Sequence, residues 1–173
     1  MEGFFHGSSS GIDPLQCYLG KPFRITPDSL ELLADGFPRS GIRIFLIDTK
    51  EKSSTKPLVE YFRKQRESDA FMTGFQRDYL PCVRACMDTV IGGDHDGFFK
   101  ALRELTRGQL RFFRPMIPDG MLPLFEREYD FNFGVKILGS GGGGYMLGFT
   151  DDCQRAAELL RGGDVLWLNT ETS

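Results

Sequence analysis

The sequence predicts an α+β domain in which helices pack on one face of an antiparallel sheet. The predicted elements follow the order strand, helices, strand–loop–strand, helix, strand, which is typical of this class. The spacing of apolar residues is helical in the middle of the chain and changes to short strand-like runs in the final forty residues. No internal repeat is visible, so repeat architectures are not indicated.

The first part of the chain contains two strand signals separated by a linker. Residues 21–26 predict a strand that is closed by Pro27. Residues 36–41 are rich in Gly, Pro and Ser, which indicates a linker or a domain seam. The nearly continuous apolar run of residues 42–47 then predicts a buried strand.

The middle of the chain predicts helices with apolar faces. Leu58, Val59 and Phe62 share one face of a first helix. A longer stripe with steps of three or four residues follows, with a bend expected at Pro81; its members are Phe71, Phe75, Tyr79, Cys82, Cys86 and Val90.

A double glycine, Gly92-Gly93, ends that helix, and Asp94 is suited to cap the next one. The next helix carries an apolar stripe that polar Gln109 interrupts; its apolar members are Phe98, Leu102, Leu105 and Phe112. A last helix of this block is expected to begin near Asp119 and to end before Phe131.

The final part predicts two strands around a glycine loop, then a helix and a strand. The strands are residues 135–138 and 145–149. Thr150 is expected to cap a helix that runs through Leu160, Gly162-Gly163 to end it, and residues 165–168 to form the last strand.

Composition excludes several classes of protein. With 21 basic and 24 acidic residues the net charge is -3 and the sequence pI is near 5.4, which argues against a nucleic-acid partner. No run approaches the roughly 18 apolar residues of a membrane helix, and the first residues do not resemble a signal peptide. The four cysteines form no zinc pattern, so we expect reduced thiols in a cytoplasmic protein.

The first group of candidate functional residues lies near the N-terminus, in the segment that runs from Glu2 through His6-Gly-Ser-Ser-Ser-Gly-Ile-Asp13. Two carboxylates bracket a loop of small residues whose backbone N–H groups could approach an anion. On spacing alone, Asp13 could instead be a helix N-cap with Pro14 at the first helical position. His6 could equally be a structural histidine.

The second group is the glycine loop Gly139-Ser140-Gly141-Gly142-Gly143-Gly144, between two predicted strands. Glycine allows backbone amides to approach a phosphate closely. The loop is neither a Walker loop, because no Gly-Lys-Ser/Thr follows, nor a Rossmann turn, because a strand follows it. A hairpin needs about two to five turn residues, so this run is longer than a turn requires.

The third group is the segment 48–59, Asp-Thr-Lys-Glu-Lys-Ser-Ser54-Thr55-Lys56-Pro-Leu-Val, in which a strand ends, a hydroxyl-rich loop follows and a helix is expected to begin at about Lys56-Pro57. A helix N-terminus with nearby hydroxyls and a lysine is suited to hold a carboxylate or a phosphate. The alternative is that Ser54 or Thr55 is simply the N-cap of that helix.

Taken in order, the three groups resemble motifs of the GHMP superfamily of small-molecule kinases, and of the mevalonate kinases most closely. His6-Gly-Ser-Ser-Ser-Gly-Ile-Asp13 is similar to His-Gly-x-Pro-Ser-Gly-(Val/Ile)-Asp, and residues 54–59 resemble the loop before the first C-terminal helix. Residues 136–144 resemble the last GHMP motif, Lys-x-Thr/Ser-Gly-Ala-Gly-Gly-Gly-Gly. Ser9 replaces the usual proline and Ser140 the usual alanine, and Gln109 stands where the family often carries Asn or Gln.

The resemblance implies a kinase that uses ATP and Mg²⁺ to phosphorylate a small hydroxylated substrate. It implies that Asp13 is the catalytic carboxylate and that Glu2, eleven positions earlier, binds magnesium. Residues 139–144 would lie beside the ATP phosphates. Substrate-binding roles are implied for a further set: His6, Gly7, Ser10, Gly11, Ser54, Thr55 and Lys56.

The phosphate loop of the family, Pro-x-x-x-Gly-Leu-Gly-Ser-Ser-Ala, is not found in these 173 residues. The resemblance therefore divides the chain into the tail of a nucleotide-holding domain, residues 1–40, and a ferredoxin-like GHMP C-terminal domain, residues 41–173. We expect a missing N-terminal domain or subunit as partner, with a homodimer as another expected assembly, and the chain alone to be inactive. Two alternatives stay open: a heptose-type sugar or phosphomevalonate kinase, and a non-catalytic fragment that acts as a binding module.

Overall fold

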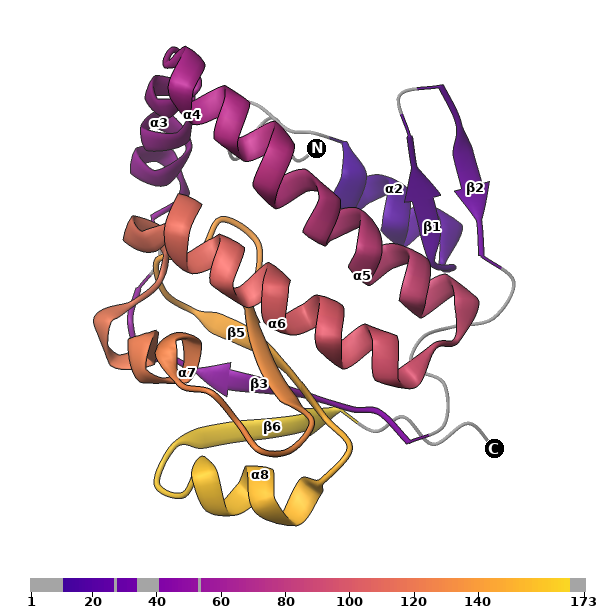
Figure 1. The fold of residues 1–173 in the computed structure, drawn as a ribbon, viewed down its shortest axis with the longest axis vertical. Helices are drawn as coiled ribbons and strands as arrows, with labels where there is room; N and C mark the ends of the chain where they lie inside the picture. Colours follow the sequence, from indigo (N-terminus) through magenta and orange to yellow (C-terminus); the bar gives the residue numbers. More distant parts are fainter. Residues whose placement is uncertain (1–10, 27, 34–40, 53, 169–173) are drawn as a thin grey trace. The chain divides into compact units, whose positions relative to one another are not determined.

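The protein is described by a computed structural model that covers residues 11–26, 28–33, 41–52 and 54–168 (Figure 1). The chain forms two compact units, Met1–Arg39 and Ser40–Ser173. Four residues with predicted roles lie outside the described residues: Glu2, His6, Gly7 and Ser10. In the described part of the chain, no helix combines the length and the apolar character that crossing a membrane requires.

The first unit contains a short helix and a two-stranded sheet. Helix α2, Ile12–Leu19, begins after Gly11 and ends at Gly20, both in the left-handed conformation. Strands β1, Phe23–Ile25, and β2, Leu30–Leu32, pair antiparallel. The sequence predicts β1 but not β2, whose three residues are too short to show a periodic pattern.

The second unit is built on a four-stranded antiparallel sheet with the order β4-β5-β3-β6. Its strands are β3, Arg43–Asp48; β4, Phe133–Ile137; β5, Tyr145–Thr150; and β6, Asp164–Leu168. All three pairings are antiparallel. The predicted α+β class is confirmed.

Helices α5, Leu80–Gly92, and α6, His95–Phe112, lie on one side of this sheet (Figure 1). The ring of Phe98 contacts Phe149 of β5, and Gly134 of β4 leaves room for Leu102. The Asp94 side chain accepts a hydrogen bond from the Gly97 N–H, which confirms the predicted cap of α6.

The opposite face carries the main core and is covered by α7, Leu122–Glu126, and α8, Cys153–Leu159 (Figure 1). Register places Phe45 beside Gly148 and Trp167, and Ala156 of α8 belongs to the same buried cluster as Phe45. Helices therefore lie on both faces of the sheet, whereas the sequence predicts them on one face. Apolar spacing identifies the buried side of each helix but not the sheet face that it covers.

Two details of the helices differ from expectation. The apolar stripe before Pro81 runs through α4, Asp69–Gly74, and a π-helical turn, Phe75–Tyr79, into α5. The wider turn lies just before the proline, where the sequence indicates a bend. The N-cap of α8 is Asp152, which accepts from the Arg155 N–H, whereas the Thr150 hydroxyl accepts from the Asp152 N–H.

Candidate active site

The glycine loop, residues 139–144, connects β4 to β5 in a backbone conformation that favours glycine. Gly141, Gly142 and Gly144 have φ angles of 72°, 73° and 69°, and Gly143 has a φ of 145°. Residues other than glycine rarely adopt such φ angles, because their Cβ atom would clash with the neighbouring backbone. The glycine run is thus required by the shape of the loop, whatever the loop binds.

Close packing imposes a second requirement at Gly141 and Gly142. A Cβ on Gly141 would lie 2.5 Å from the carbonyl oxygen of Met116, and one on Gly142 would lie 2.5 Å from Cδ1 of Leu58. The Gly142 N–H donates to the Met116 carbonyl at 2.6 Å. This part of the loop is therefore held between the segment after α6 and the helix that carries Leu58.

That helix is α3, Thr55–Gln65, and its N-terminus lies beside the loop. The hydroxyl oxygens of Thr55 and Ser140 are 3.2 Å apart, within hydrogen-bond distance. Ser54 is the N-cap, as the simpler interpretation predicts, but its side chain makes no capping hydrogen bond. Ser54, Thr55 and Lys56 are all exposed. The second and third groups of the sequence thus meet at one place.

Several amides of the loop are already paired. The Gly141 N–H donates to the Leu138 carbonyl, and the Gly144 N–H donates to the carbonyl of Glu51 at 2.8 Å. Within the described parts of the chain, no acceptor is found for the amides of Gly139, Ser140 and Gly143. These amides, together with the first turn of α3, are the groups that can bind an anion.

The charged side chains next to the loop are arranged around two lysines. The ammonium of Lys136 donates to the Ile137 carbonyl at 2.8 Å, and burial lowers its pKa. Lys50 forms ion pairs with Asp164 and Asp48. The hydrogen bond to Asp164, followed by the one to Asp48, raises the pKa of the Lys50 ammonium. Both lysines already have hydrogen-bond partners.

The first group of candidates is described only in part. Gly11 is the N-cap of α2, and Asp13 is an exposed residue of its first turn. The helix begins at Ile12, so Asp13 is not the N-cap, contrary to the alternative considered for the sequence. The carboxylate still lies where the helix dipole stabilises a negative charge.

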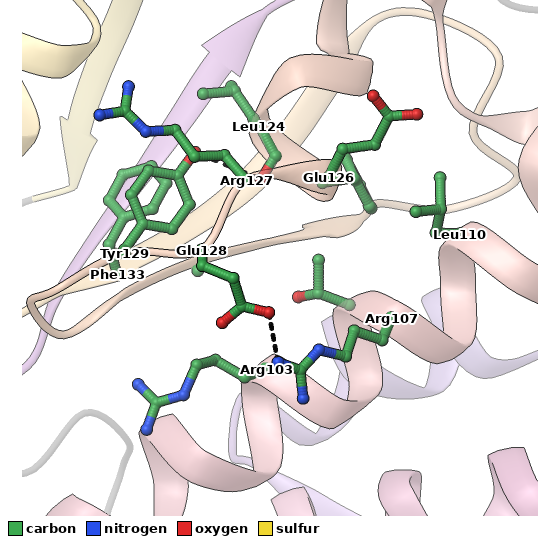
Figure 2. Close-up of a pocket in the computed structure, with 12 residues that line it drawn as sticks. Arg103, Arg107, Leu110, Leu124, Glu126, Arg127, Glu128, Tyr129 and Phe133 are labelled. Carbon is green, nitrogen blue, oxygen red and sulfur yellow. Dashed lines mark hydrogen bonds and ion pairs between the residues drawn. The ribbon is translucent and has the colours of Figure 1, made fainter.

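A small cavity of about 100 Å³ lies elsewhere, between α6 and the segment that joins α7 to β4 (Figure 2). Arg107 reaches across it from α6 to an ion pair with Glu128. None of its lining residues belongs to the three groups that the sequence indicates. Arg107 is also paired with Glu104, so two carboxylates already neutralise it.

Two residues help to position the loop although the sequence indicates no such role for them. Met116 acts through its backbone carbonyl, which any residue could supply. Thr49 directs its N–H and its hydroxyl at the Gly144 carbonyl, at 2.9 and 2.8 Å. A threonine after a buried strand is too common a pattern to indicate such a role.

Comparison with known proteins gives structural likenesses only. No protein-family model and no curated protein matches the sequence. Mevalonate kinase from L. major, in complex with R-mevalonate, is similar with a TM-score of 0.67 and 17% identity over 93% of this chain. Streptococcus pneumoniae phosphomevalonate kinase, in complex with phosphomevalonate and AMPPNP, has a TM-score of 0.60 and 14% identity over 73% of the chain.

The likeness confirms the fold that the sequence motifs imply. It covers 50% of the mevalonate kinase and 40% of the phosphomevalonate kinase, so the chain spans about half the length of these proteins or less. The chain therefore has the fold of one part of two small-molecule kinases.

Proposed function

We propose that this chain is the C-terminal portion of an ATP-dependent small-molecule kinase of the GHMP type, most similar to mevalonate kinases. Such an enzyme transfers the γ-phosphoryl group of ATP to a hydroxyl of a small substrate. The contact between Ser140 and Thr55 carries the proposal, because it joins two separately predicted motifs at one site. The fold, shared with two small-molecule kinases, supports it independently.

Phosphoryl transfer depends mainly on positioning and on neutralising charge, and the site offers groups for both. The amides of Ser140 and Gly143 can donate to phosphate oxygens, because no described residue accepts from them. The first turn of α3 adds its partial positive charge and the exposed hydroxyl of Thr55. In this proposal these groups orient the reactants and stabilise the charge that develops on the phosphoryl group.

Asp13 is proposed to orient the acceptor hydroxyl and to take its proton. Its exposed carboxylate is free of the capping role, since Gly11 occupies the N-cap position. Glu2 is proposed to hold magnesium, which would neutralise negative charge on the ATP phosphates when bound. Among the described residues no group of three acidic, histidine or cysteine side chains is placed to hold a metal, so this assignment rests on the sequence resemblance.

The acceptor is proposed to be mevalonate or a compound of similar size. A phosphorylated acceptor such as phosphomevalonate, or a heptose-type sugar, is the alternative within the same chemistry. Ser9 replaces the family's proline and Ser140 replaces its alanine. Because these departures bear on substrate identity more than on the chemistry, the test includes all of these acceptors. We also propose a second polypeptide segment, domain or subunit as partner, to supply the rest of the two-domain fold.

The test is a transfer assay on the complete protein that contains this chain, with Mg-ATP and each candidate acceptor. Phosphorylated product is detected by mass spectrometry, and the Asp13→Asn variant controls for contaminating kinases. We expect product with at least one acceptor. A folded complete protein that binds Mg-ATP but phosphorylates none of them would contradict the kinase proposal and favour a non-catalytic binding module.

A further inference from the structure

We propose that Thr49 is a positioning residue of the active site, which fixes the glycine loop so that the Gly143 amide faces the transferred phosphate. This inference rests on the proposed kinase function and gives a role to a residue for which the sequence indicates none. Thr49 follows β3 and precedes α3, so it belongs to a connection that runs beside the loop.

This connection binds both backbone polar groups of Gly144. Its carbonyl accepts from the N–H and from the hydroxyl of Thr49, and its N–H donates to the carbonyl of Glu51. The same Thr49 oxygen accepts from the Glu51 N–H at 3.3 Å. Thr49 is only 9% exposed, so water cannot readily replace these bonds.

The backbone at Lys50 turns sharply to make this arrangement. Lys50 has a φ of 60°, which is unfavourable for a residue with a side chain. The Lys50 N–H donates to the Asp48 carboxylate at 2.9 Å, and its ammonium pairs with Asp48 and Asp164. Strained backbone persists where surrounding contacts hold it, and here they aim the Glu51 carbonyl at Gly144.

The loop is consequently fixed at two points that flank Gly143. Gly142 is bound to the Met116 carbonyl, and Gly144 to the Thr49–Glu51 connection. The amide of Gly143, between them, has no acceptor among the described residues. Its direction is therefore set by the two anchors, and the Thr49 hydroxyl is the one side-chain donor described in them.

The decisive variants are Thr49→Val, which removes the hydroxyl and keeps the shape, and Thr49→Ser, which restores it. Thr150→Val is the matched control. Its hydroxyl likewise donates to a carbonyl, that of Asn132 at 2.8 Å, and accepts from the N–H two residues on. Thr150 is also buried, but it lies at the opposite end of β5 from the loop.

The first measurement is hydrogen exchange of residues 139–144 in the chain, which needs no activity. We expect at least tenfold faster exchange of the Gly144 amide in Thr49→Val, and rates near wild type in Thr49→Ser and Thr150→Val. Unchanged exchange in Thr49→Val would overturn the proposal. So would equal acceleration in Thr150→Val, because the effect would then be general loosening.

The second measurement is kcat and KM for transfer in the complete protein. A displacement of about 1 Å at a reacting group can cost on the order of a hundredfold in rate. We expect Thr49→Val to lower kcat by tenfold or more with little change in acceptor KM, and Thr49→Ser to restore most of it. Wild-type kcat in Thr49→Val, or no rescue by serine, would overturn the role. If wild-type protein transfers no phosphate, the kinase proposal fails, whereas the exchange result still decides whether Thr49 positions the loop.

Discussion

The side-chain oxygen of Gln109 accepts a hydrogen bond from the Ile137 N–H at 2.8 Å, in the buried space between α6 and β4. The side-chain amide of Gln109 points to the Tyr79 hydroxyl at 3.5 Å. Gln109, a polar residue in the apolar stripe of α6, thus binds the end of the strand that leads into the glycine loop. A buried backbone N–H needs an acceptor, and Gln109 supplies it.

Replacing Gln109 by leucine should destabilise the chain. The buried Ile137 N–H would lose its acceptor, which costs about 1–3 kcal/mol of unfolding free energy. Urea denaturation measures this loss. Lys100→Ala, at an exposed position of the same helix, should change stability by no more than about 0.5 kcal/mol. A Gln109→Leu variant as stable as wild type would show that the N–H has another acceptor.

Much of the second unit could be predicted from local pattern. Strand β3 appears as an apolar run, and the stripe on α6 matches its buried residues Phe98, Leu102, Leu105 and Phe112. The order β4-β5-β3-β6 and the covering of both sheet faces depend on long-range packing. Residue spacing along a single strand does not record such packing.

The candidate site could be predicted only where side chains carry a signal. The glycine run and the Ser54-Thr55-Lys56 segment stand out in the sequence, and the structure brings them together through Thr55 and Ser140. The anchors of the loop do not stand out, because Met116 and Glu51 contribute backbone carbonyls. Backbone groups are the same in every residue, so no residue type marks them.

Gly143→Val should abolish transfer in the complete protein for a reason other than lost stability. Gly162 provides the matched control, because its φ of 91° is also positive and its Cβ position is open. Valine at either site introduces backbone strain of about 1–3 kcal/mol. Both variants should therefore melt at lower temperature, whereas only Gly143→Val should lose turnover. Retained turnover in Gly143→Val would assign the loop a structural role.

The chain should expose apolar surface from its first unit. In the part of this unit that the structure describes, the large apolar side chains at 45% exposure or more are Ile12, Tyr18, Ile25, Leu30 and Leu32. Exposed apolar surface commonly mediates association, so we expect self-association of the isolated chain and binding of a fluorescent apolar dye. Tyr18 is 87% exposed, so Tyr18→Ser should reduce both the self-association and the dye binding.

Met87→Ser is the control for that experiment, since Met87 is less exposed and belongs to α5. Analytical ultracentrifugation and dye fluorescence measure the outcome. A monomer at high concentration that binds no dye would contradict the prediction. An equal effect of the two substitutions would show that the first unit is not the associating surface.

Asp78 should contribute to acid sensitivity. Its hydrogen bonds with Arg77, and then with Arg111, lower the pKa of its carboxyl to about 2. Because the folded pKa lies below the ordinary value of 3.8, its contribution to stability is present above that value and is lost as pH falls toward 2. Asp78→Asn should therefore lose less stability than wild type between pH 4 and pH 2.

Thermal melting across that pH range, at low salt, measures the difference. Asp88→Asn is a useful comparison, because Asp88 is an exposed acidic residue of α5. Parallel melting curves of wild type and Asp78→Asn would show that the Arg77 and Arg111 contacts do not persist in solution.

Asp13→Asn should leave the fold almost unchanged and remove most of the turnover. Gly11, not Asp13, is the N-cap of α2, so the substitution removes only a favourable charge in the first helical turn. Such a charge is worth about 0.3–1 kcal/mol at an exposed site. Loss of a group that orients and deprotonates a hydroxyl instead costs on the order of 10²–10⁴ in rate.

Asp96→Asn separates these two effects, because Asp96 is the second residue of α6 just as Asp13 is the second residue of α2. Both substitutions remove a first-turn carboxylate and should lower the melting temperature slightly. In the complete protein, only Asp13→Asn should lose phosphate transfer to mevalonate or to the other acceptors, with acceptor and ATP binding largely retained. Turnover in Asp13→Asn equal to that in Asp96→Asn would confine Asp13 to stabilising its helix.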